Sequence, residues 1–526
     1  MLSDVSLPRP RLIAAATAAA VLSLSASAQP FLSPTLFLGN GPESCIPQDP
    51  ALAAHPGGGF QAVWHDGRVV WQRFDRHAAA IERGGGLATG FSEAPAVAVS
   101  PGGVAAVAWF DRQSGVVEGM VLGDGPQGFQ RLELGAVDLG GSGEHELPAF
   151  RIGLAGGPGG EFFAVWQGGP PNAALFDAEN GVRLRFSVEP GGGGCGDLIF
   201  QPAAAYDPVG DRFVAAWVAL GISCITSPPF LAVHARSFGT TGAPLGPPVP
   251  VGTSWILPFT PGPAVLPAPD GGFTVVWNGA AGHNDVAVMA RRFGPGGAPA
   301  GEKRVIADVA AVADVAAAAD AAGNLAVLWA DRAAAEAPIE LRARTFDPAL
   351  VPTSSPFLLD ADPPEDGAPR DPAVALSGPG EVTALWWKQG AVFGGVPLDC
   401  TGSEGLRGRR LGLGGDEDLL LRDGRFRVSV AWEDPHNGGS GVGRPLPDSD
   451  RSGSFWFFQE GNRELVVKVL DGRAINGRWW VFYGSLTDVA FTLTVTDQAT
   501  GESRTYENPP FTFASRGDTA AFAGLP

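Results

Sequence analysis

Eight polar residues follow recurring apolar segments of this chain, and they are its best candidates for binding a ligand. They are Asp66, Asp111, Arg112, Asn278, His283, Asp331, Arg332 and Lys388. Rings of polar loop residues on a rigid scaffold are common ligand sites. Polar residues also fill ordinary surface loops, so these residue types alone do not distinguish a binding face from a solvated one.

The carboxylates in this set could instead perform catalysis. A hydrolase or lyase that acts on polysaccharide would need two of them about 5–10 Å apart in a cleft. The common catalytic motifs are missing: the sequence has no His-Glu-x-x-His, P-loop, dinucleotide-binding glycine motif or nucleophile elbow. Ser449 to Trp456 resembles the Asp-box turn of sialidases, but Arg451 stands where that turn needs aspartate. We therefore expect no catalytic residues.

Metal and cofactor sites are not indicated either. No Cys-x-x-Cys or histidine pair has the spacing of zinc ligands. Asp416, Glu417 and Asp418 could bind calcium, but they form no recognised ligand loop, and an acidic cluster beside a domain junction is usually just solvated. We expect no cofactor and no metal.

A repeated segment positions the eight candidates. Each copy has a Gly or Asp turn, about five apolar or small residues, and a final tryptophan, as in Gly271 to Trp277. Seven copies recur at intervals of about 50 residues, and they end in Trp64, Trp109, Trp166, Trp217, Trp277, Trp329 and Trp386. A period of this length is typical of propellers and solenoids. The segments lack polar alternation, which favours strands buried on both faces.

Flanking segments supply the other strands of each repeat. Around Trp277 these are 263–266, 286–293 and 304–306, with turns between them. A proline heads several first strands, as in 95–99, 202–206 and 372–376. The sequence thus predicts a seven-bladed β-propeller, with the candidate residues in loops on one face. A row of β-sandwiches is the alternative, but each would need roughly 90–100 residues.

The ends of the repeat region suggest how the ring closes. The seventh repeat has strands near Ala373, Trp386 and Val392 and stops at Cys400 without a fourth strand. The run 35–38 precedes the first repeat and could fill that place, which leaves no long open edge. The four cysteines predict two disulfides, and loop positions favour Cys195–Cys224. Cys45–Cys400 remains, although Cys400 could start on the opposite face.

The first 28 residues have the pattern of a secretory signal. Arg9 and Arg11 precede an apolar run at 12–24, and Ala26-Ser27-Ala28 fits a cleavage site. We expect a secreted, periplasmic or cell-surface protein with no membrane span. A formal net charge of −19 disfavours nucleic acid as a partner. The few lysines and the abundant Arg, Ala and Gly suggest a bacterial source.

The chain changes character after about residue 405. Segments 425–432, 464–470 and 491–496 alternate strictly between apolar and polar residues, as half-exposed antiparallel strands do. Asp471-Gly472 and Asn476-Gly477 have hairpin-turn sequences. Six or seven strands over about 120 residues predict an immunoglobulin-like β-sandwich.

Both regions resemble uncharacterised bacterial families. The residues 455–458, 462–472, 480–484 and 494–497 resemble a C-terminal accessory module of exported proteins, and the first 400 residues resemble propeller-type repeats of surface and exported proteins. Neither resemblance implies a reaction or a site.

The expected organisation is all-β. It comprises a signal peptide at 1–28, a propeller at 29–400, a linker at 401–415 and a sandwich at 416–526. The favoured function is non-catalytic binding or scaffolding of a glycan, peptide or protein at the cell exterior. The alternatives are the polysaccharide hydrolase or lyase, and surface attachment or sorting through the C-terminal domain.

Overall fold

The computed structural model describes residues 36–524 with gaps, and all but one of its elements are β-strands. The gaps are 40–47, 66–67, 76–79, 83–85, 90–91, 124–128, 139–149, 190–198, 221–230, 255–261, 281–285, 310–311, 332–338, 361–367, 379–380, 390–391, 394–395, 398–404, 413–417, 423–424, 450, 460–461, 498–499 and 501.

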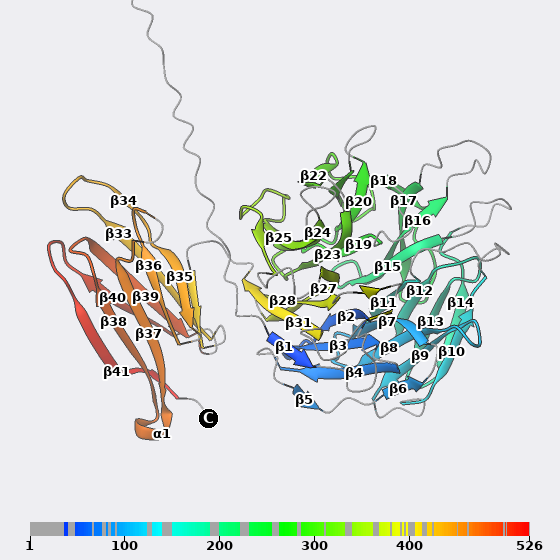
Figure 1. Ribbon diagram of the computed structural model, residues 1–526, viewed down its shortest axis with the longest axis horizontal. Helices are drawn as coiled ribbons and strands as arrows, with labels where there is room; N and C mark the ends of the chain where they lie inside the picture. Colours follow the sequence, from blue (N-terminus) through cyan, green and yellow to red (C-terminus); the bar gives the residue numbers. More distant parts are fainter. Residues whose placement is uncertain are drawn as a thin grey trace, which may run out of the picture.

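The described residues up to Gly412 form seven sheets of four or five strands, which we number as blades in chain order (Figure 1). Blade 1 contains β2 (Gln48–Ala54), β3 (Phe60–His65), β4 (Arg68–Phe74), β5 (Ala80–Glu82) and β6 (Gly86–Thr89). Blade 2 contains β7 (Ser92–Val99), β8 (Ala105–Asp111), β9 (Val116–Leu122) and β10 (Leu132–Ala136). Blade 3 contains β11 (Ile152–Gly156), β12 (Phe162–Trp166), β13 (Ala173–Asp177) and β14 (Gly181–Phe186).

The next blades repeat this antiparallel order. Blade 4 contains β15 (Ile199–Asp207), β16 (Arg212–Leu220), β17 (Leu231–Gly239) and β18 (Val249–Ser254). Blade 5 contains β19 (Ala264–Pro267), β20 (Phe273–Ala280), β21 (Val286–Phe293) and β22 (Arg304–Asp308). Blade 6 contains β23 (Val312–Ala319), β24 (Leu325–Asp331), β25 (Glu340–Phe346) and β26 (Phe357–Leu358). Blade 7 contains β27 (Ala368–Gly378), β28 (Glu381–Gln389), β31 (Gly405–Gly412) and β1 (Leu36–Gly39).

The first strands of the blades follow one another around a central tunnel. In the order β2, β7, β11, β15, β19, β23 and β27, each contacts the next, and β27 contacts β2. The sheets therefore form a closed ring, which is the arrangement of a β-propeller.

The recurring tryptophans occupy equivalent places between the blades. Seven apolar clusters of described residues separate neighbouring blades, and each holds the tryptophan of the later blade. Six of these side chains are at most 2% exposed, and Trp64 is half-buried. Both faces of each second strand are covered, which explains why the repeated segments lack polar alternation.

Blade 7 departs from the expected boundaries. Its third strand is β31, which lies inside the range 401–415 that we expected to be a linker, and β1 pairs with its outer edge. The segment near Val392 instead forms a separate hairpin of β29 (Val392–Phe393) and β30 (Val396–Pro397). Leu406 and Leu411 fix β31 in the ring because they are buried in the cores that blade 7 shares with its neighbours.

The C-terminal residues form two five-stranded antiparallel sheets. One contains β32 (Asp418–Leu421), β33 (Phe426–Glu433), β34 (Ser440–Val442), β39 (Ala490–Asp497) and β40 (Glu502–Asn508). The other contains β35 (Arg444–Ser449), β36 (Ser452–Trp456), β37 (Leu465–Gly472), β38 (Arg478–Ser485) and β41 (Ser515–Ala523). The two expected hairpin turns flank one short helix, α1 (Arg473–Asn476), between β37 and β38.

Alternating residues of both C-terminal sheets meet in one apolar core, so this region is a β-sandwich. The predicted fold class, an all-β propeller followed by a β-sandwich, is confirmed.

Several expectations concern residues outside the described part of the chain. These are the signal sequence, all four cysteines, and Asp416 and Glu417. Asp418 is described, and its carboxylate pairs with Arg427 at 2.6 Å. In the described ranges, no helix is long and apolar enough to cross a membrane, and no group of three or more His, Cys, Asp or Glu side chains could hold a metal ion.

Candidate active site at the mouth of the propeller tunnel

Several first strands share a backbone irregularity near their start, where they reach the tunnel. Asp49, Ala94, Gln201 and Asp371 each precede a proline and each have φ between 47° and 52°. The pairing register of each strand shifts at the same point. Non-glycine residues rarely adopt this conformation, and β-bulges re-aim side chains beside functional sites. Here they lie at one rim of the tunnel.

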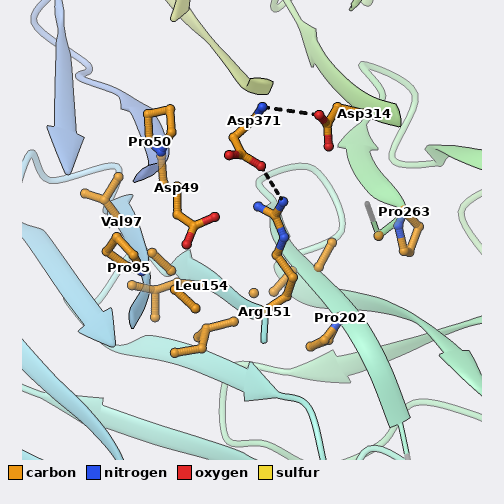
Figure 2. A pocket seen from close by; sticks show the side chains of 18 of the residues that line it. Asp49, Pro50, Pro95, Val97, Arg151, Leu154, Pro202, Pro263, Asp314 and Asp371 are labelled. Carbon is orange, nitrogen blue, oxygen red and sulfur yellow. Dashed lines mark hydrogen bonds and ion pairs between the residues drawn. The ribbon is translucent and has the colours of Figure 1, made fainter. Parts of the chain in front are cut away.

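A cavity of about 250 Å³ lies at this rim (Figure 2). Its charged lining residues come from four blades: Asp49 lies near the start of β2, Arg151 precedes β11, Asp314 lies in β23 and Asp371 in β27. The rest of the lining consists mainly of proline, alanine and other small or apolar residues. Residues far apart in sequence thus meet because each stands at the start of a first strand.

Gly153 and Gly262 let these strands approach closely. A Cβ atom at Gly262 would come within 2.2 Å of the Gln201 carbonyl oxygen, and one at Gly153 within 2.7 Å of the backbone at Ala203–Ala204. No side chain larger than hydrogen fits at either position without displacing backbone. The cavity therefore depends on glycine at two of its seven strand entrances.

Arg151 is the centre of the charged cluster. Its Nη2 lies 3.5 Å from Oδ1 of Asp371, and the backbone N–H of Asp371 donates to Oδ2 of Asp314 at 3.3 Å (Figure 2). Burial opposes the charge on Arg151, but Asp49, Asp371 and Asp314 outweigh it and raise its pKa. Arg151 is therefore charged at all accessible pH values and favours ionised carboxylates around it.

Asp49 has a different environment from Asp371. Burial raises the pKa of Asp49; Arg151 partly opposes this shift, and Glu93 and Asp314 add to it. Asp371 instead has a direct ion pair with Arg151, with about a quarter of its side chain exposed. One cavity thus holds two different carboxyl groups. Burial favours the protonated form of Asp49, whereas Asp371 lies next to the positive charge of Arg151. Two carboxyl groups in contrasting environments suit an acid and its partner base.

Asp111, Arg112 and Asp331 are described, and none of them is among the residues that line the cavity. Asp111 closes β8, where its Oδ1 accepts the Gln113 N–H at 2.8 Å and its Oδ2 lies 3.3 Å from Arg131. Arg112 pairs with Glu93 at 2.7 Å. Asp331 closes β24 and lies 3.7 Å from Arg342.

The other candidates divide into two groups. Asn278 is buried in β20, 2% exposed, and its amide atoms have no hydrogen-bond partner in the described protein. Lys388 lies in β28, with its side chain outside the described part. Asp66, His283 and Arg332 also lie outside it.

Asp49, Arg151, Asp314 and Asp371 are not among the candidates predicted from the sequence. The prolines at the heads of first strands were predicted, but the residues before them were not. Asp49-Pro50 and Asp371-Pro372 carry the available signal, which is a polar residue directly before a first-strand proline. Arg151 and Asp314 precede Ile152 and Val315, so only alignment of the repeats could have identified them.

Comparisons with known proteins give a likeness of fold at low identity. No protein-family model matches the sequence, and no curated protein matches it. Among solved structures, a protein of unknown function from Dyadobacter fermentans matches with TM-score 0.44 and 11% identity, over 72% of this chain and 99% of that one. An α-L-arabinofuranosidase from Fusarium graminearum matches with TM-score 0.41 and 10% identity, over 73% and 99%. A polysaccharide lyase matches with TM-score 0.37 and 9% identity, over 72% and 91%.

These findings correct the expected function. The main expectation was a non-catalytic binding or scaffold protein, and no enzyme. Glycoside hydrolases and a polysaccharide lyase are among the similar solved structures, so the comparisons agree better with the alternative of a polysaccharide-acting enzyme than with the main expectation. Likeness at this level carries no argument about residues, so any mechanism must come from the cavity itself.

Proposed function

We propose that this protein is a hydrolase that acts on polysaccharide, with its active site in the cavity at the tunnel mouth. The observation that carries this proposal is the contrast between Asp49 and Asp371 within one cavity. Glycoside hydrolysis needs one carboxylic acid to protonate the leaving oxygen and one carboxylate on the other side of the bond.

The roles follow from the two environments. Asp49, whose pKa burial raises, gives its proton to the glycosidic oxygen as the bond from that oxygen to the anomeric carbon breaks. Water attacks the anomeric carbon and loses a proton to Asp371, whose carboxylate pairs with the Arg151 guanidinium. Asp314 accepts the backbone N–H of Asp371 and so positions that residue. The products are one sugar with a new hemiacetal hydroxyl and one free alcohol.

The lining residues favour a hydrolase over a lyase. A lyase removes a proton next to the carboxylate of a uronic acid, and it needs both a cation for that carboxylate and a base. Among the described lining residues, Arg151 is the one cation and already faces three carboxylates, and the described lining holds no His, Tyr or Lys. An anionic sugar would meet net negative charge here, so a neutral sugar suits the cavity better.

The size of the cavity supports action near the end of a chain. Pockets that enclose drug-sized ligands have volumes of about 300–1,000 Å³, and this cavity has about 250 Å³. It suits one sugar ring better than an extended segment. We infer that a terminal unit enters the tunnel mouth while the rest of the chain lies on the propeller face.

A substrate screen with three variants tests the proposal. We expect the full chain to release reducing sugar from at least one of arabinan, xylan, galactan, mannan or β-glucan, or to cleave a 4-nitrophenyl glycoside. Asp49→Asn and Asp371→Asn should each lower kcat by about 10²–10⁴-fold. Asp347→Asn, in a surface turn between β25 and β26, is the matched control and should keep full activity. No hydrolysis of any substrate, or full activity in both mouth variants, would refute the proposal.

A further inference from the structure

A second cavity, of about 520 Å³, lies in the groove between blades 5 and 6. Its walls are β22 of blade 5 and the second and third strands of blade 6, β24 and β25. The charged and aromatic residues of its lining are Asp308, Trp329, Asp331, Arg342 and Arg344. It shares no lining residue with the tunnel-mouth cavity.

Strand register places this groove at the same level as the tunnel mouth. Asp314, which lines the mouth, is paired with Ala330, whose neighbours Trp329 and Asp331 line the groove. Trp329 is in turn paired with Arg342 on the next strand outward. Neighbouring strands lie about 4.8 Å apart, so Arg342 is about 10 Å farther from the axis than the Asp314 row. A sugar chain that runs outward from the mouth along blade 6 would reach the groove.

The groove offers both donors and acceptors. The Trp329 indole N–H bonds the Asp331 carboxylate, and the Arg342 guanidinium lies 3.7 Å from Asp331 and also pairs with Glu340. Arg342 keeps about a third of its side chain exposed, whereas Asp331 is mostly buried. Two carboxylates and two guanidinium groups balance in the lining, so the groove favours a neutral ligand with hydroxyl groups over a charged one.

The residue paired with the equivalent tryptophan differs between blades. It is Val70 in blade 1, Glu118 in blade 2, His234 in blade 4, Met289 in blade 5 and Arg407 in blade 7. Val70 and Met289 have no polar group that could bind a hydroxyl. The indole of Trp277 instead donates to a backbone carbonyl, that of Thr253. The closed ring can therefore form without a charged pair such as Asp331 and Arg342 at this position.

We propose that the groove between blades 5 and 6 is an outer subsite, where Arg342 and Asp331 bind a neutral sugar unit farther along the chain whose end occupies the tunnel mouth. The proposal rests on the proposed hydrolase function for the identity of the chain, but its binding test does not depend on catalysis. The site gives the enzyme a preference for polymers over small glycosides.

Affinity electrophoresis of the full chain in gels that contain arabinan, xylan, galactan, mannan or β-glucan tests the subsite. We expect at least one polysaccharide to retard the wild-type protein, and Arg342→Met to lose most of that retardation. The matched control is Arg183→Met, which removes a similarly exposed arginine that lies 3.5 Å from Asp177 in blade 3, and it should migrate like the wild type. Equal retardation of both variants, or no retardation of the wild type by any polysaccharide, would overturn the subsite.

Kinetics separate the subsite from the function itself. On oligosaccharides of four or more units, Arg342→Met should lower kcat/KM at least about 10-fold, which corresponds to about 1.4 kcal/mol. On a 4-nitrophenyl monoglycoside it should leave kcat/KM unchanged, whereas Asp371→Asn should inactivate the enzyme on both. Equal losses on both substrates would contradict the subsite. Polysaccharide binding without any hydrolysis would refute the hydrolase and leave the subsite in place.

Discussion

Trp277 of blade 5 packs directly on Gly252 of blade 4. A Cβ atom at Gly252 would come within 2.5 Å of Cζ2 of the indole, far inside van der Waals contact. The same relationship joins Trp166 of blade 3 to Gly135 of blade 2, where the distance would be 2.7 Å. In both cases a glycine of the fourth strand receives the tryptophan of the next blade, so glycine here is a packing requirement.

Gly252→Ala should therefore destabilise the propeller. The added methyl group must displace Trp277 or the strand, and overpacking of this kind costs about 1–3 kcal/mol. Gly246→Ala is the control, because an added Cβ at Gly246 in the same blade has no atom within 4 Å. Urea unfolding followed by tryptophan fluorescence measures the difference. If both variants unfold at the same urea concentration, the packing of Trp277 does not require a glycine at position 252.

Arg212 should be irreplaceable by lysine. Its guanidinium is buried and joins blade 4 to two turns of blade 5: Nε donates to Asp207 at 3.0 Å, Nη2 to the Gly271 carbonyl at 2.9 Å, and Nη1 to the Pro295 carbonyl. Lysine keeps the charge but cannot reach three acceptors in one plane. We expect Arg212→Lys to lower the free energy of unfolding by about 2–4 kcal/mol.

Arg183→Lys is the matched control for that substitution. Arg183 is 42% exposed and lies 3.5 Å from Asp177, so its ion pair is a surface one. Such pairs contribute about 0–1 kcal/mol, and lysine should replace this arginine at little cost. Thermal unfolding of the two variants provides the comparison, and equal melting temperatures would show that Arg212 does not join the blades.

The propeller was predictable because its signal is repeated. Each blade must bury both faces of its second strand and place an indole against the preceding blade, so the same apolar segment recurs seven times. The third strand of blade 7 escaped prediction because arginine and glycine alternate there with the buried Leu406 and Leu411. This strand packs few large side chains and is held by its neighbours on both sides.

The site at the tunnel mouth was not predictable in the same way. Each blade contributes one residue to the rim, and that residue changes from blade to blade: Asp49, Arg151 and Asp314 occupy equivalent places. A single aspartate before a proline is also an ordinary turn pattern. The site becomes visible only when the closed ring brings these strand entrances together.

His436 in the sandwich should titrate above the usual range for histidine. Its Nε2 bonds both carboxylate oxygens of Asp488, at 3.0 and 3.1 Å, and this contact raises the pKa of His436 more than burial lowers it. Nuclear magnetic resonance should give a pKa above about 6.5. The ion pair between His436 and Asp488 stabilises the folded protein fully at a pH below the ordinary pKa of histidine. This stabilisation is lost as the pH rises through the raised pKa of His436.

Asp488→Asn provides the check on that assignment. The amide keeps the shape of the carboxylate but removes its charge, so the pKa of His436 should fall back towards about 6.5. The melting temperature of this variant should then depend less on pH between 6 and 8 than that of the wild type. An unshifted His436 in the wild-type protein would contradict the ion pair.

Asp49→Asn should stabilise the protein at neutral pH while it removes the catalytic acid. Burial raises the pKa of Asp49, with Arg151 opposing and Glu93 and Asp314 adding to the shift. The folded state therefore binds a proton that the unfolded state releases at about pH 4. The contribution of Asp49 to the free energy of unfolding is fully present below that pH. As the pH rises from there to the pKa of Asp49 in the folded state, this contribution falls by about 1.4 kcal/mol for each pH unit.

Asparagine cannot ionise, so the variant escapes this decline. Urea unfolding at pH 4 and pH 8 should show a free energy of unfolding that falls less for Asp49→Asn than for the wild type, with Asp347→Asn behaving like the wild type. A variant that is less stable than the wild type at pH 8 would mean that Arg151 needs the ionised Asp49, and the two carboxyl groups at the tunnel mouth would then have the opposite roles. The buried carboxyl group thus ties the proposed chemistry to a measurable loss of stability.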